Sequence, residues 1–167
     1  MVRLGLHPIA LHGVAADGGC TCPRGKSCSG IGKHPVLRAW QKEPVRWADL
    51  DAMFASNWRL NLGLRMGRQP SGVNLVTIDV DGPRSLLASL EAEHGKLPPT
   101  LTARTGSGGL HLVYRVPANR RIRNRVRLAP GVDVRAEGGQ IVASPSRHRS
   151  GAHYSWIDAR EPAELYE

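Results

Sequence analysis

Two aspartates stand one residue apart in an otherwise apolar stretch, VTIDVDGP. The β-branched residues of this stretch predict a buried strand, in which side chains two positions apart share a face. Asp79 and Asp81 should therefore point the same way, with Cβ atoms roughly 6–7 Å apart. Carboxylates this close raise each other's pKa unless a cation lies between them, and Mg²⁺ or Mn²⁺ suits that position. The alternative is a solvated pair at a strand end, with Asp81 and Gly82 forming a turn.

Two later segments add side chains of the kinds that bind phosphates and metals. The segment TGSGGLHLVYRV places Ser107 and His111 around a glycine-rich turn that leads into a strand. Backbone N–H groups around Gly108 could approach a phosphate closely, and an imidazole could bind its oxygens. The segment GVDVRAEGG adds a third strand-borne carboxylate, Asp133, beside Arg135. An ordinary surface ion pair is the alternative for these two residues.

All the cysteines of the chain lie in one short, glycine-rich stretch, CTCPRGKSCSGIGKHP. With a nearby histidine they offer four sulfur and nitrogen ligands, a set that fits a tetrahedral structural Zn²⁺. These candidate ligands are Cys20, Cys22, Cys28 and His34. His12 is an alternative fourth ligand, and unligated thiols are the other interpretation. We assign residues 13–35 to this Cys/His loop module, and the odd, tightly spaced cysteines favour a reducing cytoplasm over a disulfide framework.

The elements that must position these residues are short strands and helices. We expect one helix over residues 47–56 and another that begins at Pro83 and ends at Gly95. The expected strands cover residues 62–66, 73–80, 100–105, 110–116, 131–135 and 140–143, the last two forming a hairpin around Glu137. This pattern predicts an α+β fold, a mostly antiparallel sheet with helices covering one face, in a single domain over residues 1–167.

The composition favours a polyanionic partner. The 167 residues include 23 Lys and Arg against 14 Asp and Glu, a formal net charge of +9. Such an excess makes nucleic acid the first partner to consider, although it also aids solubility by itself. The arginine-rich segment 120–127 is expected to be a basic loop or sheet edge that could follow a phosphate backbone. No apolar run approaches the roughly 20 residues of a membrane span, so no membrane partner is expected.

In their order and spacing, these motifs resemble the bifunctional primase–polymerase (prim-pol) domain of plasmid and phage replication proteins, which belongs to the archaeo-eukaryotic primase superfamily. The resemblance rests on the two-aspartate strand, the glycine turn with its histidine, and the Asp133 strand followed by GGQIVASPS. It extends to GKHPVLRAW, NLGLRMG and SRHRSGAHYSW, so that the matching blocks span residues 32–156. Each block alone is weak, and the order of the blocks makes the match specific.

The resemblance implies a primase/RRM-like catalytic core and a template-directed nucleotidyl transferase. This enzyme would be a DNA primase and/or DNA polymerase of plasmid, phage or mobile-element replication, acting by a two-metal mechanism. In the family pattern Asp79, Asp81 and Asp133 hold Mg²⁺ or Mn²⁺, while His111, with Ser107 in the preceding turn, contacts the triphosphate. The implied partners are a DNA template and primer, nucleoside triphosphates, and a helicase domain or subunit.

Arg104 and Arg135 are further candidates for binding phosphates, because Arg offers a rigid bidentate fork.

Other interpretations are weaker or excluded. A Walker phosphate loop would need glycine at position 20, where Cys20 stands. The His-x-His pair of rolling-circle nickases and the H-x-E and P-C-x-x-C motifs of zinc deaminases are missing. A non-catalytic single-stranded DNA-binding module that retains the primase fold stays open as an alternative.

Overall fold

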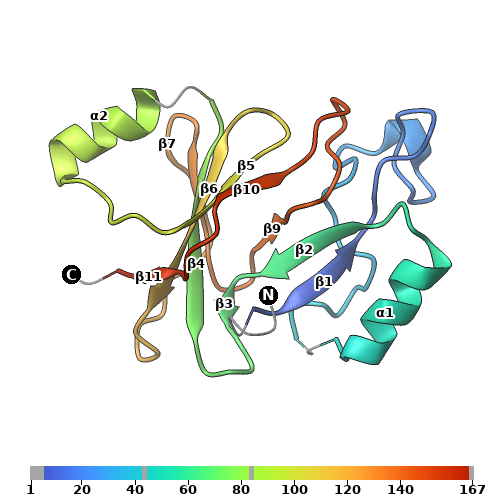
Figure 1. The fold of residues 1–167 in the computed structure, drawn as a ribbon, viewed down its shortest axis with the longest axis horizontal. Helices are drawn as coiled ribbons and strands as arrows, with labels where there is room; N and C mark the ends of the chain where they lie inside the picture. Colours follow the sequence, from blue (N-terminus) through green and yellow to red (C-terminus); the bar gives the residue numbers. More distant parts are fainter. Residues whose placement is uncertain (1–5, 43–44, 83–84, 166–167) are drawn as a thin grey trace.

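Two β-sheets, rather than the single sheet expected, organise the chain (Figure 1). The structure, a computed structural model, describes residues 6–42, 45–82 and 85–165. The described part is α+β, with mostly antiparallel strands and two α-helices, as the sequence predicts.

The larger sheet has eight strands, in the order β10–β5–β6–β4–β8–β7, with β11 beside β6 and β3 beside β4. Its strands are β3 (Gly67–Arg68), β4 (Asn74–Val80), β5 (Leu101–Arg104), β6 (Leu110–Val116), β7 (Arg125–Ala129), β8 (Val132–Arg135), β10 (Ser155–Asp158) and β11 (Ala163–Glu164). Every pair in it is antiparallel except β11 with β6. Because β4 is paired with β6 along one edge and β8 along the other, its register is fixed from both sides.

The smaller sheet is antiparallel and packs against the larger one. Its order is β1–β2–β9, formed by Pro8–Leu11, Asn61–Arg65 and Gln140–Val142. A shared apolar cluster joins the sheets and consists of Leu6, Leu64, Met66, Leu75, Leu101, Val113, Ile141 and Ala143. Since both sheets contribute fully buried side chains, burial of this cluster holds β9 opposite β4 and β6.

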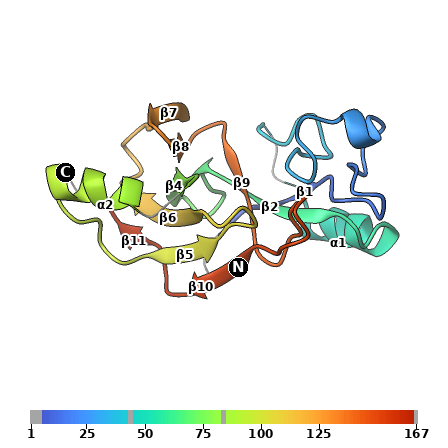
Figure 2. The same cartoon turned by 90° about the horizontal axis from the view of Figure 1, so that it is seen from above.

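The helices lie at opposite ends of the molecule (Figures 1 and 2). Helix α1 (Trp47–Ser56) has the predicted bounds and lies against β1 of the smaller sheet. Helix α2 (Ser85–His94) ends as predicted before Gly95, whose φ of +95° is typical of the residue that follows a helix. The predicted first residue of this helix, Pro83, lies outside the described residues. The helices therefore do not cover one common face of a sheet, and the expectation that they would is wrong. No helix in the described ranges has the length and apolar character needed to cross a membrane.

The predicted hairpin of residues 131–143 does not form. Strand β8 pairs with β4 and β7 in the larger sheet, whereas β9 pairs with β2 in the smaller one. The chain crosses between the sheets at Glu137, whose carboxylate accepts a hydrogen bond from the backbone N–H of Arg68 at 3.1 Å. The glycines after Glu137 therefore mark a crossing between two sheets.

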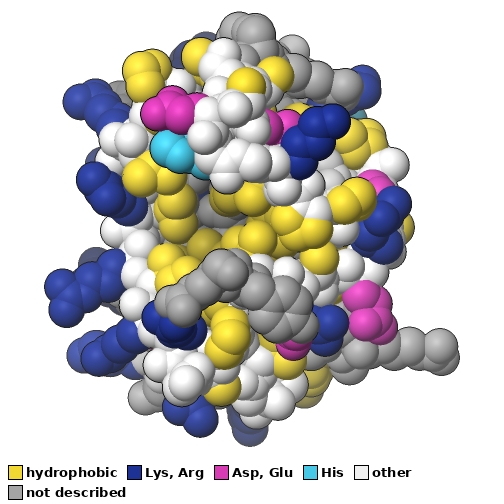
Figure 3. Space-filling model, turned by 90° about the vertical axis from the view of Figure 1, so that its left-hand side faces the viewer, with side chains coloured by type: hydrophobic (Ala, Val, Ile, Leu, Met, Phe, Trp, Pro, Cys, Tyr) yellow, Lys and Arg dark blue, Asp and Glu magenta, His cyan; other side chains and the backbone are white. Residues whose placement is uncertain are grey.

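A second apolar cluster lies on the other face of the larger sheet. Its buried members are Val76, Tyr114, Val116 and Ala136. Hydrophobic side chains gather in a hollow on that side of the molecule, with Lys and Arg side chains around it (Figure 3). The two faces of β4 thus differ: Val76, Ile78 and Val80 belong to this cluster's face, and Asp79 lies on the face turned toward the smaller sheet.

Candidate functional site

Three neighbouring strands bring the predicted carboxylates together. Asp79 of β4 lies opposite His111 of β6 and Asp133 of β8 in the antiparallel register, so the three side chains form one row across the sheet. Asp81 follows two residues later on the same face. Oxygens of Asp79, Asp81 and Asp133 lie within 4.8 Å of one another. Hard oxygen ligands at this separation could hold Mg²⁺ or Mn²⁺.

Arg135 and His111 pair with the carboxylates of this row. Arg135 lies between two of the carboxylates, with Nε 3.3 Å from Asp79 Oδ2 and Nη2 2.6 Å from Asp133 Oδ2. His111 Nε2 lies 3.4 Å from Asp79 Oδ1. The backbone N–H of Arg127 donates to Asp133 Oδ1 at 2.6 Å. Arg127 has a φ of 58° and lies where the regular pairing of β7 with β8 is interrupted. Asp133 is therefore held from both the strand edge and the guanidinium.

The carboxyls of Asp79 and Asp81 have pKa values shifted in opposite directions. Burial alone would raise the pKa of Asp79, which is 7 % exposed, but the hydrogen bond from His111 and the charge of Arg135 outweigh it and lower the pKa. Partial loss of hydration and the charge of Asp79 raise the pKa of Asp81, against the opposing charge of Lys33. The cluster thus has one firmly ionised carboxylate and one whose ionisation a bound cation would favour.

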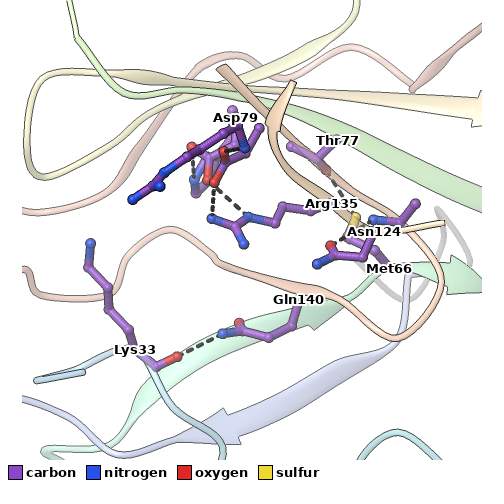
Figure 4. A network of polar contacts seen from close by, with 11 residues as sticks. Lys33, Met66, Thr77, Asp79, Asn124, Arg135 and Gln140 are labelled. Carbon is purple, nitrogen blue, oxygen red and sulfur yellow. Dashed lines mark hydrogen bonds and ion pairs between the residues drawn. The ribbon is translucent and has the colours of Figure 1, made fainter. Parts of the chain in front are cut away.

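Asp79, Asp81 and His111 form one wall of a cleft of about 190 Å³. Lys33 projects toward the Asp79 group from the other side, where the Gln140 amide donates to the Lys33 carbonyl oxygen at 2.7 Å (Figure 4). Tyr154, which is buried, closes the cleft beside His111, with ring centroids 5.9 Å apart. Burial, then the charges of Asp79 and Asp81, raise the pKa of Tyr154, so its hydroxyl stays protonated.

The sequence did not identify Lys33, Gln140 or Tyr154 as site residues. Lys33 belongs to the GKHP block, but nothing local in that block says which surface the lysine faces. Only the packing of the smaller sheet on the larger one brings these three side chains to the cleft.

Two buried polar atoms beside the cleft lack a protein hydrogen-bond partner: His111 Nδ1 and Gln140 Oε1. A buried polar atom without a partner lowers stability by about 1–3 kcal/mol. These atoms therefore offer unused hydrogen-bonding capacity next to the carboxylates. That property is common where a polar ligand binds.

The glycine turn between β5 and β6 lies at the rim of the cleft. Ser107 is exposed and lines it, and its hydroxyl is 3.0 Å from that of Thr105. The N–H of Gly108 donates to the Thr105 carbonyl oxygen at 3.0 Å, so this N–H stabilises the turn. Gly109 lies against β4, where a Cβ would be 2.1 Å from the Val80 carbonyl oxygen. The turn can approach the carboxylate strand this closely because it has glycine there.

Arg104, the other predicted phosphate-binding arginine, is not brought to the cleft. It is exposed and lies opposite Leu110 of β6, whereas its neighbour Ala103 lies opposite His111. Since side chains alternate along a strand, Arg104 belongs to the face away from the carboxylates. Arg135 alone of the two is at the site.

The cysteine loop forms a second cluster of potential metal ligands. One ligand atom each from Cys20, Cys22, Cys28 and His34 lies within 4.8 Å of the others. His34 Nε2 is 3.4 Å from the sulfur atoms of both Cys20 and Cys28. A tetrahedral Zn²⁺ would separate such atoms by roughly 3.5–3.8 Å, so this geometry fits a structural zinc site. Burial, followed by the charge of Arg24, lowers the pKa of His34 and favours the neutral imidazole that a metal requires.

The alternative ligand, His12, is not a member of this cluster among the described residues. Its ring packs against His34, with centroids 4.6 Å apart, and its Nδ1 lies 3.4 Å from the Thr21 hydroxyl. His12 is therefore placed as a neighbour of the fourth ligand rather than as the ligand.

The fold and the two clusters define the class of the protein: an α+β domain with a sheet-borne carboxylate site and a Cys₃His loop, both of which could bind metals. The chain belongs to the Prim-Pol family, because the family model described as bifunctional DNA primase/polymerase, N-terminal, matches residues 5–167. Membership implies a replication function of the primase/polymerase type, with DNA and nucleotide binding. No curated protein matches the chain. None of these findings supports the expected helicase partner.

The carboxylate row generates a prediction about metal binding. Asp133→Asn keeps the side-chain volume but removes a charged ligand, so the affinity for Mn²⁺ should fall at least about tenfold, the loss that even partners of metal ligands produce. Asp158→Asn is the matched control, because Asp158 lies on β10 in an exposed pair with Arg160. Mn²⁺ titration followed by paramagnetic resonance measures both variants. Equal affinity of Asp133→Asn and the native chain would contradict the metal assignment.

The Cys₃His cluster generates a second prediction. His34→Ala should lose stoichiometric zinc and lower the melting temperature, because structural zinc contributes directly to folding. His12→Ala, which removes the neighbouring ring, should retain zinc. Elemental analysis of the purified variants gives the zinc content per chain. Zinc loss from His12→Ala but not from His34→Ala would reverse the assignment.

Proposed function

We propose that this protein is a template-directed nucleotidyl transferase, a DNA primase and/or DNA polymerase, which serves replication of a plasmid, phage or other mobile element. The observation that carries the proposal is the group of three carboxylates, Asp79, Asp81 and Asp133, two of which line a cleft together with Lys33, in a chain that belongs to the Prim-Pol family. In the reaction, the 3′-hydroxyl oxygen of the growing strand bonds to the α-phosphorus of a nucleoside triphosphate. The bond to the β-phosphate oxygen breaks, pyrophosphate leaves, and the hydroxyl proton passes to water.

The acidic side of the cleft would bind the cations of this reaction. Asp79, Asp81 and Asp133 would hold two Mg²⁺ or Mn²⁺ ions, a role supported by the 4.8 Å grouping of their oxygens. Bound there, such ions lower the pKa of an attacking hydroxyl and neutralise a leaving pyrophosphate. The protein's own part is to hold Asp79 on β4, whose register two neighbouring strands fix, with Asp133 directly opposite on β8.

The basic side of the cleft would bind the triphosphate. Lys33 and Arg135 line the cleft and supply positive charge, while His111 and Ser107 offer hydrogen-bond donors. The unused Nδ1 of His111 supports its assignment as a ligand-binding residue. Base pairing with the template, rather than a protein side chain, would select the nucleotide.

The Cys₃His loop would hold a structural Zn²⁺ in this proposal. Its apolar cluster is small and consists of Val14, Cys20, Cys22, Cys28 and Ile31. With so little apolar surface to bury, the loop would depend on the metal for its order. The basic segment 120–127, exposed along its whole length, would contact the DNA backbone.

One observation favours a second candidate, a non-catalytic single-stranded DNA-binding module. Arg135 already pairs with Asp79 and Asp133, so the protein itself places a positive charge between two of the three carboxylates. A module of this kind would need no metal at the row. Metal-dependent binding of a nucleoside triphosphate separates the two candidates, since only the transferase requires it.

Primer extension tests the proposed function directly. With Mg²⁺ or Mn²⁺ and deoxynucleoside triphosphates, the native chain should extend a labelled primer on a DNA template. Asp79→Asn should reduce the rate at least about a hundredfold, because a bound cation supplies several kcal/mol of transition-state stabilisation. Asp158→Asn should extend like the native chain. Extension by Asp79→Asn at the native rate would show that the reaction does not take place in this cleft. Absence of both extension and metal-dependent nucleotide binding in the native chain would favour the binding module.

A kinetic prediction follows for Lys33. Lys33→Ala should raise KM for the nucleotide about tenfold to a hundredfold, the effect of losing one charged hydrogen bond of about 1.5–3 kcal/mol. Lys96→Ala is the control, because Lys96 is exposed in the loop after α2. Steady-state extension rates at varied nucleotide concentration measure both variants. An unchanged KM in Lys33→Ala would exclude contact between Lys33 and the triphosphate.

A further inference from the structure

A second, larger cleft of about 370 Å³ lies on the other side of the segment Pro145–Tyr154. Its lining residues come from four parts of the chain: Val14 near the start of the cysteine loop, the end of α1 with the following turn, the start of β2, and the loop after β9. The charged residues among them, Arg59 and Arg147, are both basic, and none of the described Asp or Glu residues lines the cleft. The cleft therefore complements an anionic ligand.

Trp58 is the most unusual side chain of this cleft. It is 77 % exposed, the highest exposure among the exposed large hydrophobic side chains of the described residues. The turn that presents it is fixed, because Asn57 accepts hydrogen bonds from the N–H groups of both Arg59 and Leu60 at 3.1 Å. The Arg59 guanidinium lies 4.5 Å from the centre of the indole ring. An exposed, oriented aromatic ring beside a cation is the arrangement on which unpaired nucleobases stack.

Buried Asn61 fixes the position of the opposite wall. The residue is 3 % exposed, and its side-chain Nδ2 donates to the carbonyl oxygens of Gly32 at 2.9 Å and Arg147 at 2.8 Å. Its Oδ1 accepts the backbone N–H of Arg147 at 2.9 Å. The distance between the turn of Trp58 and the backbone of Arg147 is therefore set by a satisfied buried amide.

The same loop separates this cleft from the carboxylate cleft. Arg147 and His153 form an isolated antiparallel β-bridge, and the N–H of Tyr154 donates to the Ser146 carbonyl oxygen at 2.9 Å. His153 lines the cleft of Trp58, and its neighbour Tyr154 lines the carboxylate cleft. A strand of nucleic acid in the cleft of Trp58 would thus be separated from the carboxylates only by this loop.

We propose that this cleft binds unpaired bases of single-stranded DNA, with a base stacked on Trp58 and backbone phosphates near Arg59 and Arg147. The strand bound there is the template on its way to the carboxylate cleft, an assignment that rests on the proposed function. Duplex DNA does not fit this role, because its bases are already stacked on one another and offer no free face.

The experiment measures binding of a short fluorescein-labelled oligothymidylate by fluorescence anisotropy. Trp58→Ala weakens binding about fivefold to a hundredfold, the range for loss of one base-stacking contact. Trp58→Phe, which keeps an aromatic face, weakens it less. Trp47→Ala is the matched control, because Trp47 is 46 % exposed at the start of α1, whereas Trp58 lies in the turn after the end of that helix. Circular dichroism melting of each variant shows that the fold is kept, and a duplex probe reports sequence-independent charge attraction.

Three results would overturn the proposal: native affinity of Trp58→Ala for the single strand, equal weakening by Trp58→Ala and Trp47→Ala, or equal weakening on the duplex probe. Failure of the proposed function is separately visible in the primer-extension assay, which this experiment does not use. If the native chain neither extends a primer nor binds nucleotide in a metal-dependent way, but Trp58→Ala still weakens single-strand binding selectively, the result supports the single-strand site and contradicts the transferase.

Discussion

The mutual repulsion of three carboxylates on one face of a sheet is the constraint around which this molecule is arranged. Asp79 is nearly buried, and an unpaired carboxylate there would be strongly unfavourable. The sheet register places His111 and Asp133 on either side of Asp79, and Arg135 lies within 3.3 Å of its oxygen. Positive charge at this row, supplied by the protein's own side chains or by bound cations, therefore stabilises the ionised carboxylates.

Holding the row in place requires the two-sheet architecture. An isolated larger sheet would leave the face of Asp79 open to water, where the carboxylates would be screened and their side chains free to rotate. The apolar cluster between the sheets carries β9 and the segment of Lys33 over that face. The hydrogen bond of 2.7 Å between Gln140 and the Lys33 carbonyl oxygen then ties the cysteine loop to β9. Packing far from the carboxylates thus determines which groups oppose them.

Local sequence patterns predicted much of this structure, and the parts they missed are non-local. Two-residue alternation was enough to put Asp79 and Asp81 on one face, and local sequence signals were enough to predict the bounds of α1 and of β6. The hairpin of residues 131–143 was wrong because the pattern identifies strands and turns but not the strand with which each one pairs. The same limit explains Arg104: its face is determined by the register of Ala103 against His111, which no single strand contains. Lys33 and Tyr154 were missed because they enter the cleft only after two sheets pack together.

The segment after β9 shows why the two clefts are physically dependent on each other. Its residues alternate between the two sides, so that His153 and Tyr154 have different environments although they are adjacent. Tyr154 is packed beside His111, which pairs with Asp79, whereas Arg147 is fixed through Asn61 to the loop that carries Lys33. A displacement of this segment in either cleft must therefore move groups in the other, because the interior between them is filled by buried side chains that leave little free volume. The close packing of one loop, rather than any direct contact between the clefts, connects the exposed tryptophan to the row of carboxylates.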